Sequence, residues 1–160
     1  MKRRKNYSEI ILEIVREADS VCSAYYNSRG GMTVISCTGV EFNSELYDGS
    51  VMLHSIHGVT RMESTIEEIQ QAQEAIAAVD DQAVLYANPI VERDGRVVRS
   101  LMVTLSCRWM GLKEFKRTVD GLCAKMAQCD EVLKSHFADV VYRKIDVDAK
   151  ATHKLLMNGE

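Results

Sequence analysis

Residues 83–105 read AVLYANPIVERDGRVVRSLMVTL, and this stretch decides the fold. Two β-rich segments flank Arg93-Asp94-Gly95, and an Asp-Gly pair in that setting is typical of a β-hairpin. With Gly95 as the left-handed residue of a three-residue loop, alternate positions from Ala83 to Val91 lie opposite those from Leu105 to Val97. This register makes one face of the hairpin apolar except for Arg99.

The second face of the hairpin is mixed. Tyr86, Val98 and Met102 lie on it among polar side chains, and this is too much apolar surface for a freely solvated face. Pro89 cannot donate to a β-ladder, so it marks an edge strand or a bulge. Trp109 follows the second strand, either as a core plug or as an interface anchor. We expect a partner to bind at Tyr86, Val98, Met102 and Trp109.

Helical periodicity flanks the hairpin on both sides. A first helix is predicted over residues 7–26, with Asn6 as its N-cap. A second begins at Ser64, with Glu67 as the reciprocal capping residue, and ends near Asp80. A third is predicted over residues 112–142, and it is long enough to be kinked or to extend to a partner.

Three further strands are expected between the first two helices, over residues 32–37, 40–46 and 51–58. The last two flank Tyr47-Asp48-Gly49, and a three-residue loop there places Phe42 beside His54. The resulting order is α-β-β-β-α-β-β-α. Hairpin-linked strands with helices at the ends and middle predict an α+β fold, in which helices pack on an antiparallel sheet.

Length and composition favour one globular domain. The chain has 160 residues, of which 46% are hydrophobic and 27% charged. We expect a single domain over 1–160 with a core of about 7–142, and loose ends at 1–6 and 143–160. The net charge of -3 is unfavourable for binding nucleic acid. No apolar run reaches membrane-spanning length, and charges interrupt the stretch after the basic start, so the sequence predicts a cytoplasmic protein.

Residues that usually carry chemistry are present without the patterns that chemistry needs. The five cysteines show no C-x-x-C spacing, so we expect reduced thiols that are mostly buried. His54 and His57 have an odd spacing on a predicted strand, which sends their rings to opposite faces rather than to one metal. The sequence contains neither the GxGxxG nor the GxxxxGK(S/T) nucleotide-binding motif. We therefore predict no catalytic residue, no metal and no cofactor.

Two interpretations of the arginines remain open. Arg93 and Arg96 are best explained as charges that protect the hairpin tip from aggregation. Arg99 falls on the apolar face, where a buried guanidinium needs a partner. An alternative function follows, in which Arg99, His54 and a cysteine line a pocket that binds a small ligand or catalyses a reaction.

The order of elements resembles the type III secretion chaperone-like superfamily and, within it, the YbjN family of small bacterial proteins. The similarity is carried by residues 65–126: an amphipathic helix, Ala83-Val84-Leu85-Tyr86, the tight turn at 93–96, the strand at 97–103, and Leu112-Lys113-Glu114-Phe115 at the start of a helix. It implies a non-enzymatic homodimer that binds a partner polypeptide, as secretion chaperones do, or acts as a regulator. This is the function that we expect.

Overall fold

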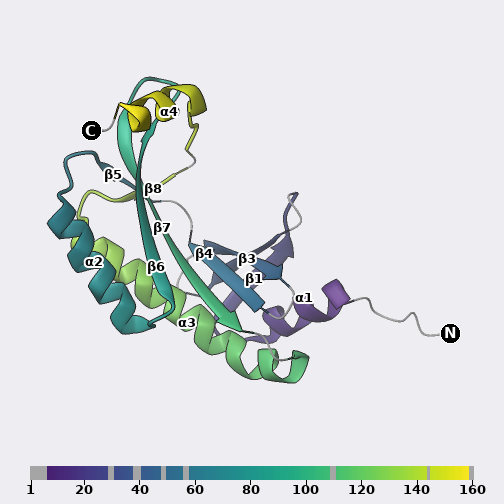
Figure 1. The fold of residues 1–160 in the computed structure, drawn as a ribbon. Helices are drawn as coiled ribbons and strands as arrows, with labels where there is room; N and C mark the ends of the chain where they lie inside the picture. The colour runs from purple at the N-terminus through teal and green to yellow at the C-terminus, as the bar shows by residue number, and fades with distance from the viewer. Residues whose placement is uncertain are drawn as a thin grey trace. The chain divides into compact units, whose positions relative to one another are not determined.

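The computed structural model is that of an α+β protein with antiparallel strands and packed helices (Figure 1). It describes residues 7–28, 31–37, 41–47, 50–55, 58–108, 111–143 and 145–158. The chain divides into two compact units, residues 1–55 with 105–130 and residues 56–104 with 131–160. Each unit is described below by itself. That the whole chain behaves as one domain stays a prediction.

The first unit is built on four consecutive antiparallel strands. These are β1 (Val21–Tyr26), β2 (Met32–Ser36), β3 (Glu41–Tyr47) and β4 (Ser50–Ser55). Helix α1 (Tyr7–Glu17) contacts β1, and the first part of α3 (Leu112–His136) belongs to the same unit. Buried side chains recur at helical spacing along α3 and form much of this core: Phe115, Val119, Leu122, Cys123, Met126 and Cys129.

The predicted first helix is wrong in its second half. The helix ends at Glu17, and after a short turn residues 21–26 form β1. A β-bulge at Val21/Ser23 leaves Val21 and Ala24 buried, three positions apart. Three-residue spacing is also the spacing of a helix face, so the bulge mimicked helical periodicity. The expected cap, Asn6, lies outside the described residues.

The register of the first predicted hairpin also differs. Tyr47 pairs with Ser50, so the loop has two residues, and Phe42 pairs with Ser55 rather than with His54. Two-residue loops with Asp-Gly are the commonest hairpin connections. The predicted strand over 51–58 is divided, because β4 ends at Ser55 and a separate strand, β5, begins at Gly58.

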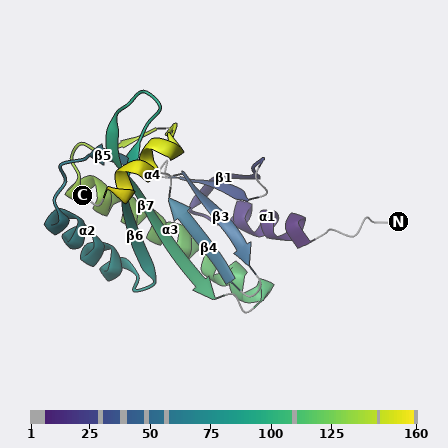
Figure 2. The same ribbon diagram turned by 45° about the horizontal axis from the view of Figure 1, so that its top comes forward.

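The second unit contains residues 83–104, which form most of the predicted hairpin. Its strands are β5 (Gly58–Arg61), β6 (Ala83–Val91), most of β7 (Val97–Arg108) and β8 (Val141–Tyr142), in the spatial order β6-β7-β5-β8. Helix α2 (Ile66–Val79) contacts β6 on one side, and α4 (Ala149–Met157) contacts β6 near the hairpin turn. Figure 2 shows the same neighbourhood of α4 and β6 from a second direction.

The register predicted for the β6–β7 turn is confirmed. Gly95 has φ +92°, the amide N–H of Glu92 donates to the carbonyl oxygen of Arg96, and Gly95 N–H donates to Glu92. The loop is therefore Arg93-Asp94-Gly95 with the left-handed residue at Gly95. On the face predicted to be apolar, Leu85, Leu101 and Val103 are buried.

Two helix ends differ from the expectation. Thr65, not Ser64, caps α2, because its hydroxyl accepts from the N–H of Glu68. Helix α3 ends at His136 instead of continuing to Tyr142, and the chain then forms β8. The side chain of Asp139 accepts hydrogen bonds from the Thr60 hydroxyl (2.6 Å) and the Arg61 N–H (2.8 Å), which hold this turn against β5.

The segment predicted to be loose at 143–160 forms a helix and contacts β6 within its described residues. It contains α4, whose N-cap Asp148 accepts from the N–H of Ala151.

The eight predicted elements occur in the predicted order, and β1, β5, β8 and α4 are added to them.

Candidate protein-binding surface

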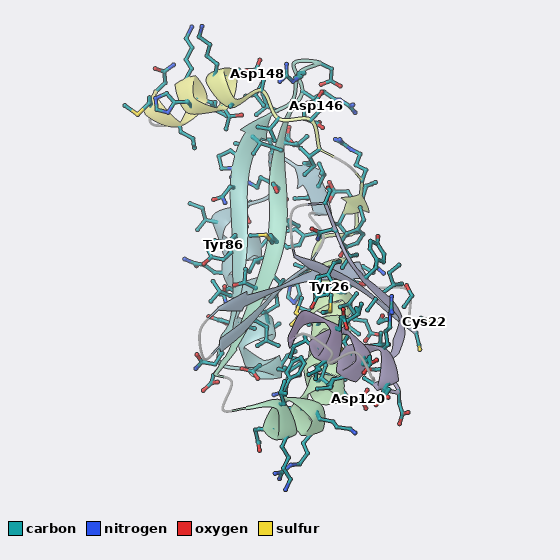
Figure 3. The ribbon with its side chains drawn as sticks, turned by 90° about the vertical axis from the view of Figure 1, so that its right-hand side faces the viewer. Cys22, Tyr26, Tyr86, Asp120, Asp146 and Asp148 are labelled. Atoms are coloured by element: carbon teal, nitrogen blue, oxygen red, sulfur yellow. The ribbon has the colours of Figure 1, made fainter. Side chains whose placement is uncertain are left out.

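One face of the β6–β7 hairpin carries apolar side chains toward solvent. We define the outer face as Val84 and Tyr86 of β6 with Val98 and Met102 of β7. Tyr86 is 44% exposed and Val84 40% exposed, whereas Val98 and Met102 are half-buried. Figure 3 labels Tyr86 beside the hairpin. Counting back from the Glu92–Arg96 pair at the turn places Tyr86 opposite Met102, so the four residues lie on one side of the ribbon, where Ser100 between Val98 and Met102 is buried.

The burial pattern along β6 changes sides between its two ends. Near its start, Ala83 and Leu85 are buried and their neighbours are exposed; near its end, Ile90 and Glu92 are buried instead. The switch coincides with a change of neighbour, because α2 contacts the start of the strand at Leu85 and α4 contacts its end at Val91. The outer face is therefore covered near the turn and open around Tyr86.

A strap made of Arg143 and residues 145–148 provides this cover. It leaves β8 at one edge of the four strands and reaches the other edge at β6, where Asp148 N–H donates to Val91 and Arg93 N–H donates to Asp146. Between these points, Arg143 forms a two-pronged ion pair with Glu92, with 2.7 Å between Nη2 and Oε2. The Glu92 side chain is 5% exposed. Asp146 and Asp148 are labelled near the turn in Figure 3.

Arg143 sets the charge state of the buried carboxyl group. Its hydrogen bond to Glu92 is the main reason why the pKa of Glu92 lies below its ordinary value, and it outweighs burial, which acts in the opposite direction. The same pair raises the pKa of Arg143. Glu92 is thus ionised and paired at neutral pH, which fixes the strap to the hairpin rather than offering a proton for catalysis.

The outward edge of β6 is occupied by side chains. The Gln73 side chain accepts from Leu85 N–H (2.7 Å) and donates to the carbonyl oxygen of Ala83 (3.4 Å). At the other end, the Thr152 hydroxyl accepts from Val91 N–H (2.9 Å). Between them Pro89 has no N–H. Within the described residues β6 pairs with β7 alone, which confirms Pro89 as an edge-strand residue.

The arginines at the tip are paired rather than clustered around an anion site. Arg96 contacts Asp94 at 2.6 Å, and Arg93 contacts Asp146 at 3.0 Å. Both pairs are well exposed, so they add little stability. Arg99 is half-buried, and its Nε donates to the carbonyl oxygen of Met62 (3.2 Å). A backbone carbonyl is therefore the partner that the sequence left unnamed.

Two of the predicted site residues, Trp109 and His54, have side chains that the structure does not describe. Trp109 lies outside the described residues, and so does the side chain of His54, for which only the strand backbone in β4 is described. The alternative pocket at Arg99, His54 and a cysteine therefore stays a prediction. Among the residues described, no three His, Cys, Asp or Glu side chains form a cluster suited to a metal ion. No described helix has the length and apolarity to cross a membrane.

The cysteines are less buried than predicted. Cys123 and Cys129 are core residues, but Cys22 and Cys37 are exposed in the first unit. None of these four described cysteines is in a disulfide. The expectation that they act mostly as buried fillers is wrong for half of those described, because the bulge in β1 turns Cys22 away from the core.

Comparison with known proteins supports the fold. No family model matches the sequence, and no curated protein matches it. The structure is similar to that of YbjN from E. coli, described as a candidate transcription regulator, with TM-score 0.53 and 14% identity over 85% of this chain and 96% of that one. The HopA1–SchA chaperone–effector complex gives TM-score 0.48 and 13% identity over 81% and 91% of the two chains. The resemblance to the YbjN fold expected from the sequence is confirmed.

Sequence reasoning missed the strap and its ion pair. Glu92 directly follows the apolar strand β6, and its partner Arg143 is 51 positions away in a segment expected to be loose. The local signal available was Asp148 before the good helix formers of residues 149–157, which is a typical helix start. The pairing itself is tertiary and has no local signature.

Proposed function

We propose that this chain is a non-enzymatic protein-binding module of the cytoplasm, with a chaperone-like or regulatory role, that acts as a homodimer. Its outer face binds polypeptide, including the second copy of the chain in the homodimer. The observation that carries the proposal is the exposure of Tyr86 and Val84 beside half-buried Val98 and Met102. A tyrosine is suited to this task because its ring offers apolar area with little side-chain entropy to lose, and its hydroxyl stays solvated or hydrogen bonded.

The edge of β6 supports face binding over strand addition. A peptide that extends a sheet needs free N–H and C=O groups along an edge. On β6, Gln73 and Thr152 occupy the two ends of that edge, and Pro89 removes a donor from its middle. A partner is therefore expected to pack on side chains of the outer face and to make few main-chain hydrogen bonds.

Strand β8, at the opposite edge of the second unit's strands from β6, also carries an apolar residue on the side of the outer face. Val59 pairs with both Ser100 and Val141, which places Val141 on the side of the sheet that carries Val98 and Met102. Val141 is 54% exposed. This side of the sheet thus has exposed apolar groups at both margins, with Val59 and Ser100 buried between them. A stable interface needs about 800 Å² from each partner, an area that a few strands provide.

A matched pair of variants tests the proposal. Tyr86→Lys places a charge on the outer face, and Tyr25→Lys makes the same change on β1 in the first unit, where Tyr25 is 47% exposed. Light scattering of the wild-type protein at micromolar concentrations is expected to give twice the 18.0 kDa of one chain. We expect Tyr86→Lys to lower this mass toward that of one chain, and Tyr25→Lys to leave it unchanged.

A photo-crosslinking amino acid at position 86, compared with position 25, identifies what contacts the face in the native host. Crosslinks to a second copy or to another polypeptide from position 86 alone support the proposal. A monomeric wild-type protein together with equal crosslinking from both positions contradicts it. Circular dichroism of each variant distinguishes a lost interface from a lost fold.

A further inference from the structure

Two exposed thiols meet at the bulged end of the β1–β2 pair. The register aligns Val21 with Ser36 and then shifts, so that Cys22 is the extra residue of the bulge. One position beyond, Cys37 N–H donates to the carbonyl oxygen of Ser20 at 2.8 Å. Cys22 and Cys37 are therefore diagonal neighbours on strands that lie about 5 Å apart.

Both thiols lie on the solvent side of these strands. Val21 and Ser36 are buried on the core side, whereas Cys22 and Cys37 are exposed. The thiol of Cys22 is hydrogen bonded to that of Cys37, and this contact is the main cause of the raised pKa of Cys37. The Sγ of Cys37 also lies 3.5 Å from the carbonyl oxygen of Asp19. Figure 3 shows Cys22 at the margin of its unit.

The buried thiols provide a contrast within the same unit. Cys123 and Cys129 are almost fully buried in α3. Burial raises the pKa of Cys123 to about 11 and also keeps a peroxide in solvent away from its thiol. Accessibility and proximity thus single out one pair.

We propose that Cys22 and Cys37 are a site of reversible oxidation, at which a peroxide converts the two thiols into an intramolecular disulfide. One thiolate attacks a peroxide oxygen, which breaks the O–O bond, gives a sulfenic acid and releases water when hydrogen peroxide is the oxidant. The second thiol attacks that sulfur, the S–S bond forms, and a second water leaves. Two electrons pass from the thiols to the peroxide, and a dithiol reductant reverses the step.

The bond would tie the start of β1 to the end of β2. It closes a loop of about 15 residues, which restricts the unfolded chain and raises the melting temperature by roughly 5–10 °C. The neighbouring residue Ser20 is bonded to α3, since its N–H donates to Asp120 Oδ1 at 2.8 Å. Oxidation would therefore stabilise the junction of the strands with α3 and leave the outer face of the second unit untouched.

The sequence allows a direct test, because each of the five cysteines lies on a different tryptic peptide. The wild-type protein is treated with one equivalent of hydrogen peroxide, alkylated, digested and analysed by mass spectrometry with and without reductant. We expect peptide 17–29 linked to peptide 30–61, a loss of two hydrogen atoms from the intact chain, and reversal by dithiothreitol.

Cys22→Ser and Cys37→Ser serve as controls, since each is expected to abolish the link and the rise in melting temperature. Neither substitution touches a buried position, so both variants are expected to fold like the reduced wild-type protein. A disulfide that involves Cys107, Cys123 or Cys129, a link between chains only, or thiols that stay reduced under these conditions would overturn the proposal. None of these results bears on the outer face.

Discussion

Replacing Gly58 by alanine tests how closely β8 is packed against β5. Gly58 pairs with Leu101 on one side and Tyr142 on the other. A Cβ atom built there would lie 2.7 Å from Cγ2 of Val140 and 3.4 Å from Cε1 of Tyr142. Carbon atoms prefer separations of about 3.5–4.0 Å, so the first contact overlaps by roughly 1 Å.

The expected cost follows from the atom that must move. Cγ2 of Val140 belongs to a β-branched side chain with few alternative rotamers, so the strain passes to the backbone of β8. Overpacking of this kind destabilises the folded state by about 1–3 kcal/mol. Alanine also has less backbone freedom than glycine in the unfolded chain, which offsets about 0.5–1 kcal/mol of that cost. We expect Gly58→Ala to lower the free energy of unfolding by about 1–2 kcal/mol.

Urea unfolding followed by circular dichroism measures this difference. Gly121→Ala is the matched control, because nothing lies within 4 Å of a Cβ built at that exposed position in α3, and the change is expected to stabilise by about 0.5–1 kcal/mol. Val140→Ala removes the clashing methyl group, so the double variant should be more stable than the sum of the two single effects predicts. Additive effects, or a Gly58→Ala protein as stable as the wild type, would refute the reasoning.

Three further predictions concern single contacts. Arg143 lowers the folded-state pKa of Glu92 from 4.5, so the stability that this pair contributes is present above about pH 4.5 and is lost as the pH falls through the lowered value. Glu92→Gln should therefore be less stable than the wild type at pH 7. Urea titrations should show that this difference in the free energy of unfolding shrinks on acidification. Thr65→Ala should cost about 1 kcal/mol in thermal unfolding and Ser64→Ala less, since only the first removes the cap of α2. Thr152→Val removes a hydroxyl from the β6 edge at similar volume, and limited trypsin digestion should then release α4 faster than in wild type; equal rates would show that this bond does not hold the helix.

The β6–β7 hairpin was predictable because its signals are local. The Asp94-Gly95 pair, the left-handed loop residue and the alternation on either side agree with one another, and the structure has that register. The first hairpin had the same Asp-Gly signal, and the alternation of apolar residues favoured a three-residue loop. That prediction is wrong, because the structure pairs Leu46 with Val51 and Tyr47 with Ser50.

The elements that sequence reasoning missed depend on contacts between distant residues. The bulge that makes β1 look helical is visible only once β2 is paired with it. Asp139 ends the third helix region by bonding to β5, 79 positions earlier. The strap likewise needs Glu92 and Arg143 together. The side of the sheet that carries Tyr86 and Met102 was predictable because strand alternation alone assigns it; their role in binding stays a prediction.

The outward edge of β6, which is occupied by side chains, has a consequence for how copies of this protein associate. Growth of fibrils requires each added chain to offer a new row of unsatisfied main-chain groups to the next. Gln73 and Thr152 take up such groups at the two ends of β6, and Pro89 supplies no donor between them. Association through an apolar patch, by contrast, is satisfied once the patch meets its complement, so complexes of this protein are expected to stay small and of fixed number as concentration rises.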